Sequence, residues 1–242
     1  MADLATLGFS RNSVTIPDRL IINLEGLEKT GKNWFAFTGR EPILFVSLDR
    51  PSEATVKYFL DQGVEILTYR YPVPRVSAGT PENERINLYR PIWQSIKDVL
   101  KGCWGHNEGT LVIDTATECN ELSTLARFGK VAQIPPHLRQ ELNQEWREMF
   151  SWAEQADKMS TVFIHKMGEK FDGGGALERK GWGQTSRAME YAVEANIRTR
   201  YDAVTRSFSI QVTDCGPNMS LAGTEMVVEE GCLQALLDLV YA

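Results

Sequence analysis

Residues 19–33 read RLIINLEGLEKTGKN, and this stretch decides how the rest of the chain is interpreted. An apolar run, Arg19–Leu24, leads directly into a glycine-rich turn. The residues that follow, Lys32–Thr38, have the pattern of a helix. A strand that passes through such a turn into a helix is the opening unit of an α/β fold.

Similar apolar runs recur along the chain and predict further strands. They are Ile43–Leu48, Val64–Thr68, Thr110–Ile113, Thr161–Ile164 and a more exposed, alternating run at Ser207–Val212. Helical patterns lie at Ser52–Asp61, Ile86–Lys101, Gln140–Lys158, Ala188–Asn196 and Gly231–Tyr241, and loops are expected at Tyr71–Pro81, Lys130–Pro136 and Gly168–Gly183. Buried strands that alternate with helices predict a mainly parallel central sheet with helices on both faces, with its site at the C-terminal ends of the strands. We expect one domain over residues 1–242, with a core at about 18–215 and a C-terminal helix at about 231–241.

The turn after the first strand matches a phosphate-binding pattern. GLEKTGKN fits G-x-x-x-x-G-K-[ST] at every position except the last. Its glycines let backbone N–H groups surround a phosphate, and Lys32 supplies a positive charge, so ATP is the expected ligand. The predicted binding segment comprises Gly26, Leu27, Glu28, Lys29, Thr30, Gly31, Lys32, Asn33 and Trp34. The alternatives are a chance glycine-rich turn or a degenerate loop that binds nucleotide poorly.

Five residues are candidates for the chemistry on a bound ATP. Lys32 is expected at the β- and γ-phosphates. Asn33 and Asp114, which follows an apolar strand, are the candidate Mg²⁺ ligands, although an amide oxygen is a weaker partner for Mg²⁺ than the usual hydroxyl. Asp49 follows the second strand, expected beside the first, and is the favoured carboxylate to orient the attacking water, with Glu53 and Glu118 as competitors. His165 follows the fifth strand, where a polar side chain can sense the γ-phosphate; the alternative is a histidine bonded to backbone.

Composition limits the class of protein. The 242 residues are 43% hydrophobic and 24% charged, with a net charge of −6. No apolar stretch is long enough to cross a membrane, and the N-terminus has no signal-peptide pattern, so a cytoplasmic protein with four free cysteines is expected. The acidic balance makes nucleic-acid binding depend on a local basic patch.

With these motifs in order, the sequence resembles the RecA-like recombinase ATPases, and most closely the small ATP-binding proteins of bacteriophages, some of which are regarded as single-strand-annealing proteins. The resemblance covers roughly residues 18–215. It is carried by GLEKTGKN, the strand end at Asp49, LVIDTATE at 111–118, FIHKM at 163–167, and Gly181-x-Gly183 followed by AMEYAVEANIRTRYD at 188–202.

The resemblance implies a RecA-like P-loop core that forms homo-oligomers in the cytoplasm of a host cell and contacts single-stranded DNA through two loops, at about 119–138 and 166–183. In the second loop the candidate DNA-binding residues are Lys166, Lys170, Phe171, Arg179, Lys180 and Trp182. Cations interleaved with aromatic rings suit single-stranded DNA, and a mobile loop of mixed charge is the alternative.

The chain also departs from the family pattern. Asn33 replaces a hydroxyl ligand, Asp49 stands where Glu is usual, and the strand at 207–214 lacks the paired lysines offered to a neighbouring subunit, for which Arg198, Arg200 or Arg206 could substitute. A second hypothesis is therefore a nucleotide-bound scaffold that does not hydrolyse ATP and assembles with protein partners. A third, a small-molecule kinase with a lid at 166–187, lacks an acceptor signature.

Overall fold

The computed structural model describes residues 16–49, 53–71, 73–77, 79–135, 137–169, 177–179 and 192–241, with the backbone alone at 168, 169 and 177–179. None of the helices within these residues combines the length and apolar character that a bilayer-spanning segment requires.

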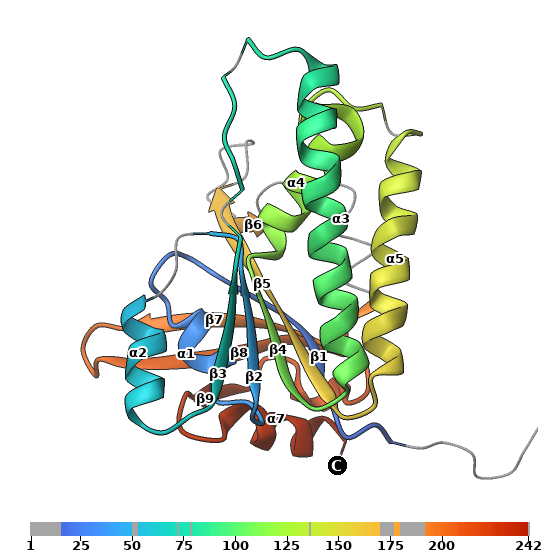
Figure 1. Ribbon diagram of the computed structural model, residues 1–242. Coiled ribbons are helices and arrows are strands. Elements are labelled where there is room, and N and C mark those ends of the chain that lie inside the picture. The colour runs from blue at the N-terminus through green and yellow to red at the C-terminus, as the bar shows by residue number, and fades with distance from the viewer. Residues whose placement is uncertain are drawn as a thin grey trace, which may run out of the picture.

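A twisted sheet forms the centre of the described residues, and its strands follow the order β3-β2-β4-β5-β1-β7-β8-β9, with β6 paired to β5 (Figure 1). Neighbouring strands run parallel from β3 to β7, whereas β8 and β9 add antiparallel strands at one edge. The strands are β1 Ile21–Gly26, β2 Ile43–Ser47, β3 Ile66–Arg70, β4 Gly109–Asp114, β5 Met159–Glu169, β6 Leu177–Arg179, β7 Ala195–Asp202, β8 Ser207–Cys215 and β9 Glu225–Val227.

Helices cover both faces of this sheet (Figure 1). One face carries α1 Lys32–Ala36, α2 Glu53–Asp61 and α7 Cys232–Val240; the other carries α3 Glu82–His106, α4 Ala116–Phe128 and α5 Arg139–Gln155. A short 3₁₀ helix, Met219–Leu221, precedes β9. The predicted fold class, an α/β core with a mainly parallel sheet and helices on both faces, is confirmed.

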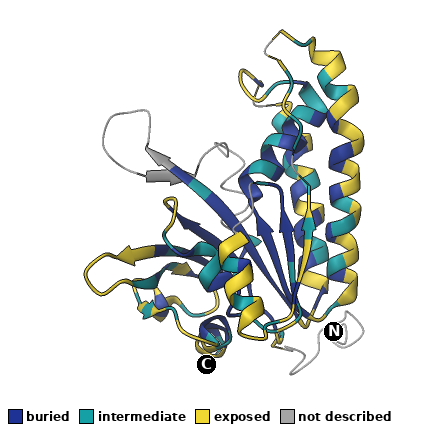
Figure 2. Ribbon diagram, turned by 60° about the vertical axis from the view of Figure 1, so that its left-hand side comes forward, coloured by how far each residue is buried: buried dark blue, intermediate teal, exposed yellow. Residues whose placement is uncertain are grey.

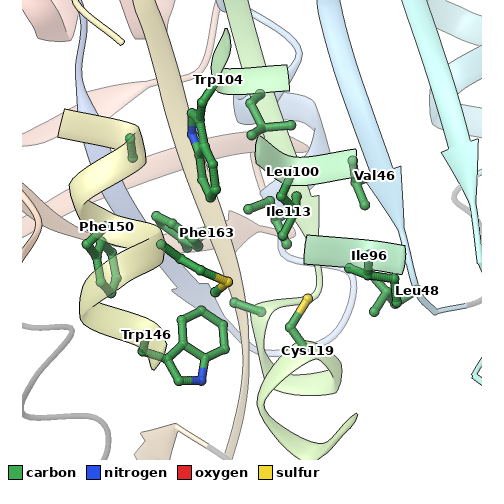
Figure 3. Close-up of a cluster of buried hydrophobic side chains, with 14 of the residues drawn as sticks. Val46, Leu48, Ile96, Leu100, Trp104, Ile113, Cys119, Trp146, Phe150 and Phe163 are labelled. Atoms are coloured by element: carbon green, nitrogen blue, oxygen red, sulfur yellow. The ribbon is translucent and has the colours of Figure 1, made fainter. Parts of the chain in front are cut away.

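Each face of the sheet has its own hydrophobic core, because side chains alternate between the two faces along every strand. Figure 3 shows the core under α3, α4 and α5, where Trp146 and Phe150 pack towards Phe163 of β5. The opposite core joins α1 and α2 to α7 through residues such as Phe35, Val56 and Leu236. The central strands are buried between the two layers (Figure 2).

Two expectations about elements need correction. The predicted helix at 188–196 is wrong at its C-terminal end, because Ala195 and Asn196 belong to strand β7, which pairs with β1. Residues 188–191 lie outside the described part of the chain. Much of the expected loop at 119–138 is helix α4, which begins with the Thr115 side chain accepting a hydrogen bond from the backbone N–H of Glu118.

The position of β2 also differs from the prediction. β2 lies beside β4, and β1 lies between β5 and β7. Asp49 therefore follows a strand that is separated by β4 and β5 from β1, the strand before the glycine-rich turn, and it lies on the side of β4 and Asp114. The interpretation of residues 1–242 as one domain stays a prediction.

Candidate functional site

The glycine-rich turn lies between β1 and α1, and its two glycines are required by close contacts. Gly31 has φ +89°, which favours glycine, and a Cβ there would lie 2.5 Å from the ring of Phe208. A Cβ on Gly26 would lie 2.2 Å from Oγ1 of Thr199 in β7. The turn is thus held against the β7–β8 hairpin, and only residues without a side chain fit at these two positions.

Lys32 occupies the first position of α1 and points back over the turn. Its Nζ donates hydrogen bonds to the backbone carbonyl oxygens of Gly26, at 2.9 Å, and of Leu27, at 2.6 Å. Burial lowers the pKa of Lys32, opposed by the nearby carboxylates of Asp114 and Glu28. An ammonium group among backbone N–H groups at a helix N-terminus is an arrangement that binds phosphate.

Asn33 and Asp114, the two candidate metal ligands, lie in direct contact. The Asn33 Nδ2 donates to Oδ2 of Asp114 at 3.1 Å. Burial raises the pKa of Asp114 to about 6, with the Asn33 hydrogen bond opposing the shift and the charge of Asp49 adding to it. Oxygen ligands of this kind suit Mg²⁺, which usually binds one or two protein groups together with phosphate oxygens and water.

The candidate water-positioning carboxylate, Asp49, is paired with a lysine. Its Oδ2 lies 2.6 Å from Nζ of Lys166, which also contacts Oε1 of Glu118 at 2.6 Å. The third carboxylate considered, Glu53, is exposed and pairs with Arg70 on β3. Asp49 and Glu118 therefore share one cation near the P-loop.

His165 lies on the other face of the sheet from α1. Side chains alternate along β5, so His165 shares the face of Phe163, and the next residue, Lys166, extends towards the P-loop. His165 is fully buried, and its Nε2 lies 2.9 Å from Oδ1 of Asn23 in β1. Its proposed contact with a γ-phosphate stays a prediction, and the residues of this strand end that line the candidate nucleotide pocket are Lys166 and Met167.

The His165 contact belongs to a series of hydrogen-bonded polar side chains across four neighbouring strands. Asn23 donates to Asn196 at 2.8 Å, and Asn196 donates to the carboxylate of Asp214 at 2.7 Å. An ionised carboxylate only accepts hydrogen bonds, so it fixes the orientation of both amides, and Nε2 of His165 is left as a donor. These hydrogen bonds connect β1, the strand before the glycine-rich turn, to its neighbours β5 and β7, and they connect β7 to β8.

The residues of the turn and the strand ends enclose a cavity of about 440 Å³. It is lined by Gly26, Glu28, Lys29, Gly31, Lys32, Asn33, Trp34, Asp49, Thr55, Asp114, Thr115, Lys166, Met167 and Phe208. The predicted binding residues Leu27 and Thr30 lie in the turn without lining the cavity; the Thr30 hydroxyl bonds to the Leu27 carbonyl and to Thr199. The cavity brings Lys32, Asp49 and Asp114 together at one place.

Sequence reasoning missed four lining residues: Thr55, Thr115, Met167 and Phe208. Thr115 and Met167 directly follow predicted residues at strand ends and could have been found by extending those motifs by one residue. Phe208 lies in a distant strand, and no local signal links it to the turn.

Aromatic side chains flank the mouth of this cavity. The ring of Trp34 stacks on that of Phe208, with centroids 5.6 Å apart, and contacts Tyr58 of α2 at 4.5 Å. Tyr201, which is 46% exposed, also packs against Phe208, with ring centroids 5.2 Å apart. Aromatic faces of this kind can stack on a nucleobase.

The candidate DNA-binding residues lie mostly outside the described part of the chain. These are Lys170, Phe171, Lys180 and Trp182, together with the side chain of Arg179. Where the backbone is described, Leu177–Arg179 pairs with Met167–Glu169, so part of the expected loop is a β-hairpin. Lys166 lines the candidate nucleotide cavity.

The three arginines considered for a neighbouring subunit have different surroundings. Arg198 pairs with Glu25, and Arg200 pairs with Glu225. Arg206 lies in the turn between β7 and β8, with φ +56°, and makes no ion pair with another described residue. It is therefore the one of the three that the described structure leaves available for another chain.

No protein-family model matches the chain. No curated protein matches it either. Among solved structures, the chain is similar to one titled "Crystal structure of the RadB recombinase", with a TM-score of 0.47 and 11% sequence identity, over 89% of this chain and 90% of that chain.

Proposed function

We propose that this chain binds ATP with Mg²⁺ in the cavity around the glycine-rich turn. The observation that carries the proposal is that Lys32, Asn33, Asp49 and Asp114, which come from three separate sequence motifs, line one cavity. Lys32 would exchange its two carbonyl partners for phosphate oxygens, and the N–H groups of residues 26–32 would surround the phosphates.

Mg²⁺ would be held by the Asp114 carboxylate and the Asn33 side-chain oxygen. When bound, the ion neutralises charge on the phosphate oxygens. Asp49 would orient the water that attacks the terminal phosphate, because it lies on the same side of the cavity as Asp114. The stacked rings of Trp34 and Phe208 offer a surface for the base.

We further propose that the protein is a DNA-dependent ATPase that forms homo-oligomers and acts on single-stranded DNA in phage recombination or replication. The family resemblance and the cations and aromatic residues between positions 166 and 182 support DNA binding. Arg206, exposed in the β7–β8 turn, is the candidate cation for a neighbouring subunit's nucleotide.

One observation favours a second function, a scaffold that binds nucleotide without hydrolysing it. Asn33 presents an amide N–H group to Asp114, whereas the usual hydroxyl would present an oxygen to the metal. A weakly held Mg²⁺ would slow hydrolysis more than it weakens nucleotide binding.

The test measures ATP affinity and turnover with and without single-stranded DNA. The variants are Lys32→Ala, Asn33→Thr and, as a control, Lys57→Ala, which removes an exposed lysine that pairs with Asp61 on α2. We expect Lys32→Ala to lower ATP affinity by at least about tenfold, since it removes a charged phosphate contact. We expect Lys57→Ala to leave affinity unchanged and DNA to stimulate wild-type turnover.

The outcomes separate the two functions. If wild type binds ATP but turns it over only after Asn33→Thr, the chain is a scaffold with an impaired metal site. If wild type binds no ATP, or Lys32→Ala binds as well as wild type, the cavity is not a nucleotide site.

A further inference from the structure

Three lysines line the cavity, and two of them, Lys29 and Lys32, belong to the phosphate-binding motif. The third, Lys166, lies in β5, and its Nζ contacts the carboxylates of Asp49 and Glu118, both at 2.6 Å. Its backbone N–H donates to Oγ1 of Thr117 at 3.0 Å. Lys166 is therefore held by the start of α4 through its backbone and its side chain, and by Asp49, which lines the cavity.

The charges of this cluster do not balance. One ammonium faces two carboxylates, and the buried Asp114 lies close enough for Asp49 to raise its pKa. Burial lowers the pKa of Lys166, but its hydrogen bonds with Asp49 and Glu118 outweigh burial, so the pKa is raised and the lysine stays charged. The cluster thus holds a cation beside the cavity with an excess of negative charge around it.

The two ion pairs are only partly buried, which makes an exchange of partners feasible. The side chains of Lys166, Asp49 and Glu118 are 32%, 38% and 23% exposed. Ion pairs with this much exposure contribute little to folding stability. A terminal phosphate carries more negative charge than either carboxylate and accepts several hydrogen bonds, so it can compete for the ammonium.

We propose that Lys166 is a second phosphate-binding lysine, specific for the terminal phosphate of a nucleoside triphosphate, and that Asp49 and Glu118 are its partners when no such phosphate is bound. The inference rests on the proposed nucleotide binding. Transfer of the ammonium to the phosphate frees Asp49 for a water molecule and loosens the contact between β5 and the start of α4. The end of β5 would therefore be in one state with a nucleoside triphosphate bound, when Lys166 contacts the phosphate, and in another with a diphosphate, when Lys166 pairs with Asp49 and Glu118.

Lys166 is favoured over His165 in this role by the alternation of side chains along β5. His165 faces the buried chain of Asn23 and Asn196, whereas Lys166 lines the cavity.

The test compares dissociation constants for a non-hydrolysable ATP analogue and for ADP, each with Mg²⁺, by calorimetry. The variants are Lys166→Met, Lys166→Arg and Glu118→Gln, with Lys130→Met as the control, because Lys130 also forms an ion pair, with the exposed Glu82, but does not line the cavity. Thermal unfolding of each variant checks that it is folded.

We expect Lys166→Met to lower affinity for the ATP analogue by at least about tenfold and affinity for ADP by less than about threefold, the difference expected from one charged contact to the terminal phosphate. Lys166→Arg should keep most of the preference for the triphosphate. Glu118→Gln should raise affinity for the ATP analogue, because it removes a competing carboxylate; a purely structural ion pair would not give this gain.

Three results would overturn the inference. Equal losses for both nucleotides in Lys166→Met would mean that the lysine does not recognise the terminal phosphate. No loss for either nucleotide would mean that the ion pairs are structural. Wild type that binds neither nucleotide would reject the proposed function itself, and the inference with it.

Discussion

At the scale of single residues, the site combines buried charge with contacts that keep it in place. Asp114 is 7% exposed at the end of β4, and its carboxylate contacts Asn33 and lies near Asp49. Burying an ionised carboxylate is unfavourable unless it is paired, which explains the raised pKa. A bound metal ion would remove this penalty, so the ionisation of Asp114 links folding stability to metal binding.

Asp114→Asn should stabilise the ligand-free protein at neutral pH. The pKa of Asp114 rises from 3.8 to about 6 on folding, so the stability linked to its proton is complete below pH 4 and is lost as the pH rises through 6. Above that pH the ionised side chain costs up to about 3 kcal/mol. Urea unfolding at pH 8 should show Asp114→Asn to be more stable than wild type by up to that amount, and the gap should shrink at pH 5.

A gap of the same size at both pH values would contradict the assignment of this titration to Asp114. The same variant should also lose Mg²⁺-dependent ATP binding, because an amide is a weaker ligand for Mg²⁺ than a carboxylate.

At the scale of elements, the β7–β8 hairpin has a larger part in the site than its sequence suggests. β7 pairs with the P-loop strand β1, and Phe208 of β8 lies against Gly31 and stacks on Trp34. The hairpin thus forms one wall of the cavity, although it follows the P-loop by more than 160 residues in the chain.

Phe208→Ala should weaken both the fold and nucleotide binding. Phe208 is half-buried, so the loss of its packing should lower the free energy of unfolding by about 1–3 kcal/mol, less than for a fully buried ring. Val204→Ala is the control in the same hairpin, since Val204 is 92% exposed and should change stability by no more than about 0.5 kcal/mol. Urea unfolding and ATP titration measure both effects, and equal behaviour of the two variants would refute this role of the hairpin.

At the scale of the whole molecule, the short helix α1 that follows the glycine-rich turn is supported by the last helix of the described chain. α1 has only five residues, too few to be stable alone, and it packs in the same core as α7. The backbone N–H of Leu233 in α7 donates to Oγ1 of Thr38 at 3.1 Å, just after α1. Helices α1 and α7, which are far apart in the sequence, therefore share one hydrophobic core.

Leu236→Ala should destabilise the whole protein. Leu236 is fully buried in this core, and its truncation should lower the free energy of unfolding by about 2–5 kcal/mol. Leu239, in the same helix, is 40% exposed, so Leu239→Ala should have an effect within about 0.5 kcal/mol. Chemical denaturation measures both, and similar midpoints for the two variants would show that α7 does not support the fold.

The predictions that succeeded at this scale were those carried by local patterns. Apolar runs of four to six residues identified β1 to β5. Strands buried on both faces, such as β1 and β4, need continuous apolar sequence, whereas β3 is mostly exposed. The helix expected to end at Asn196 failed, since Ala195 and Asn196 fit either pattern and their pairing with β1 decides for a strand.

The sequence by itself determined the α/β class, the glycine-rich turn and its lysine, and the strand ends that carry Asp49 and Asp114, because these depend on local spacing and on the chemistry of neighbouring residues. The tertiary structure alone decided the strand order, which places β5 between β1 and β4 and moves Asp49 beside Asp114. It also decided that Lys166 reaches the cavity while His165 is buried, and that Phe208 covers Gly31. These contacts join residues far apart in the chain, and they depend on which face of a strand each side chain takes and on which strands pair, neither of which local pattern fixes.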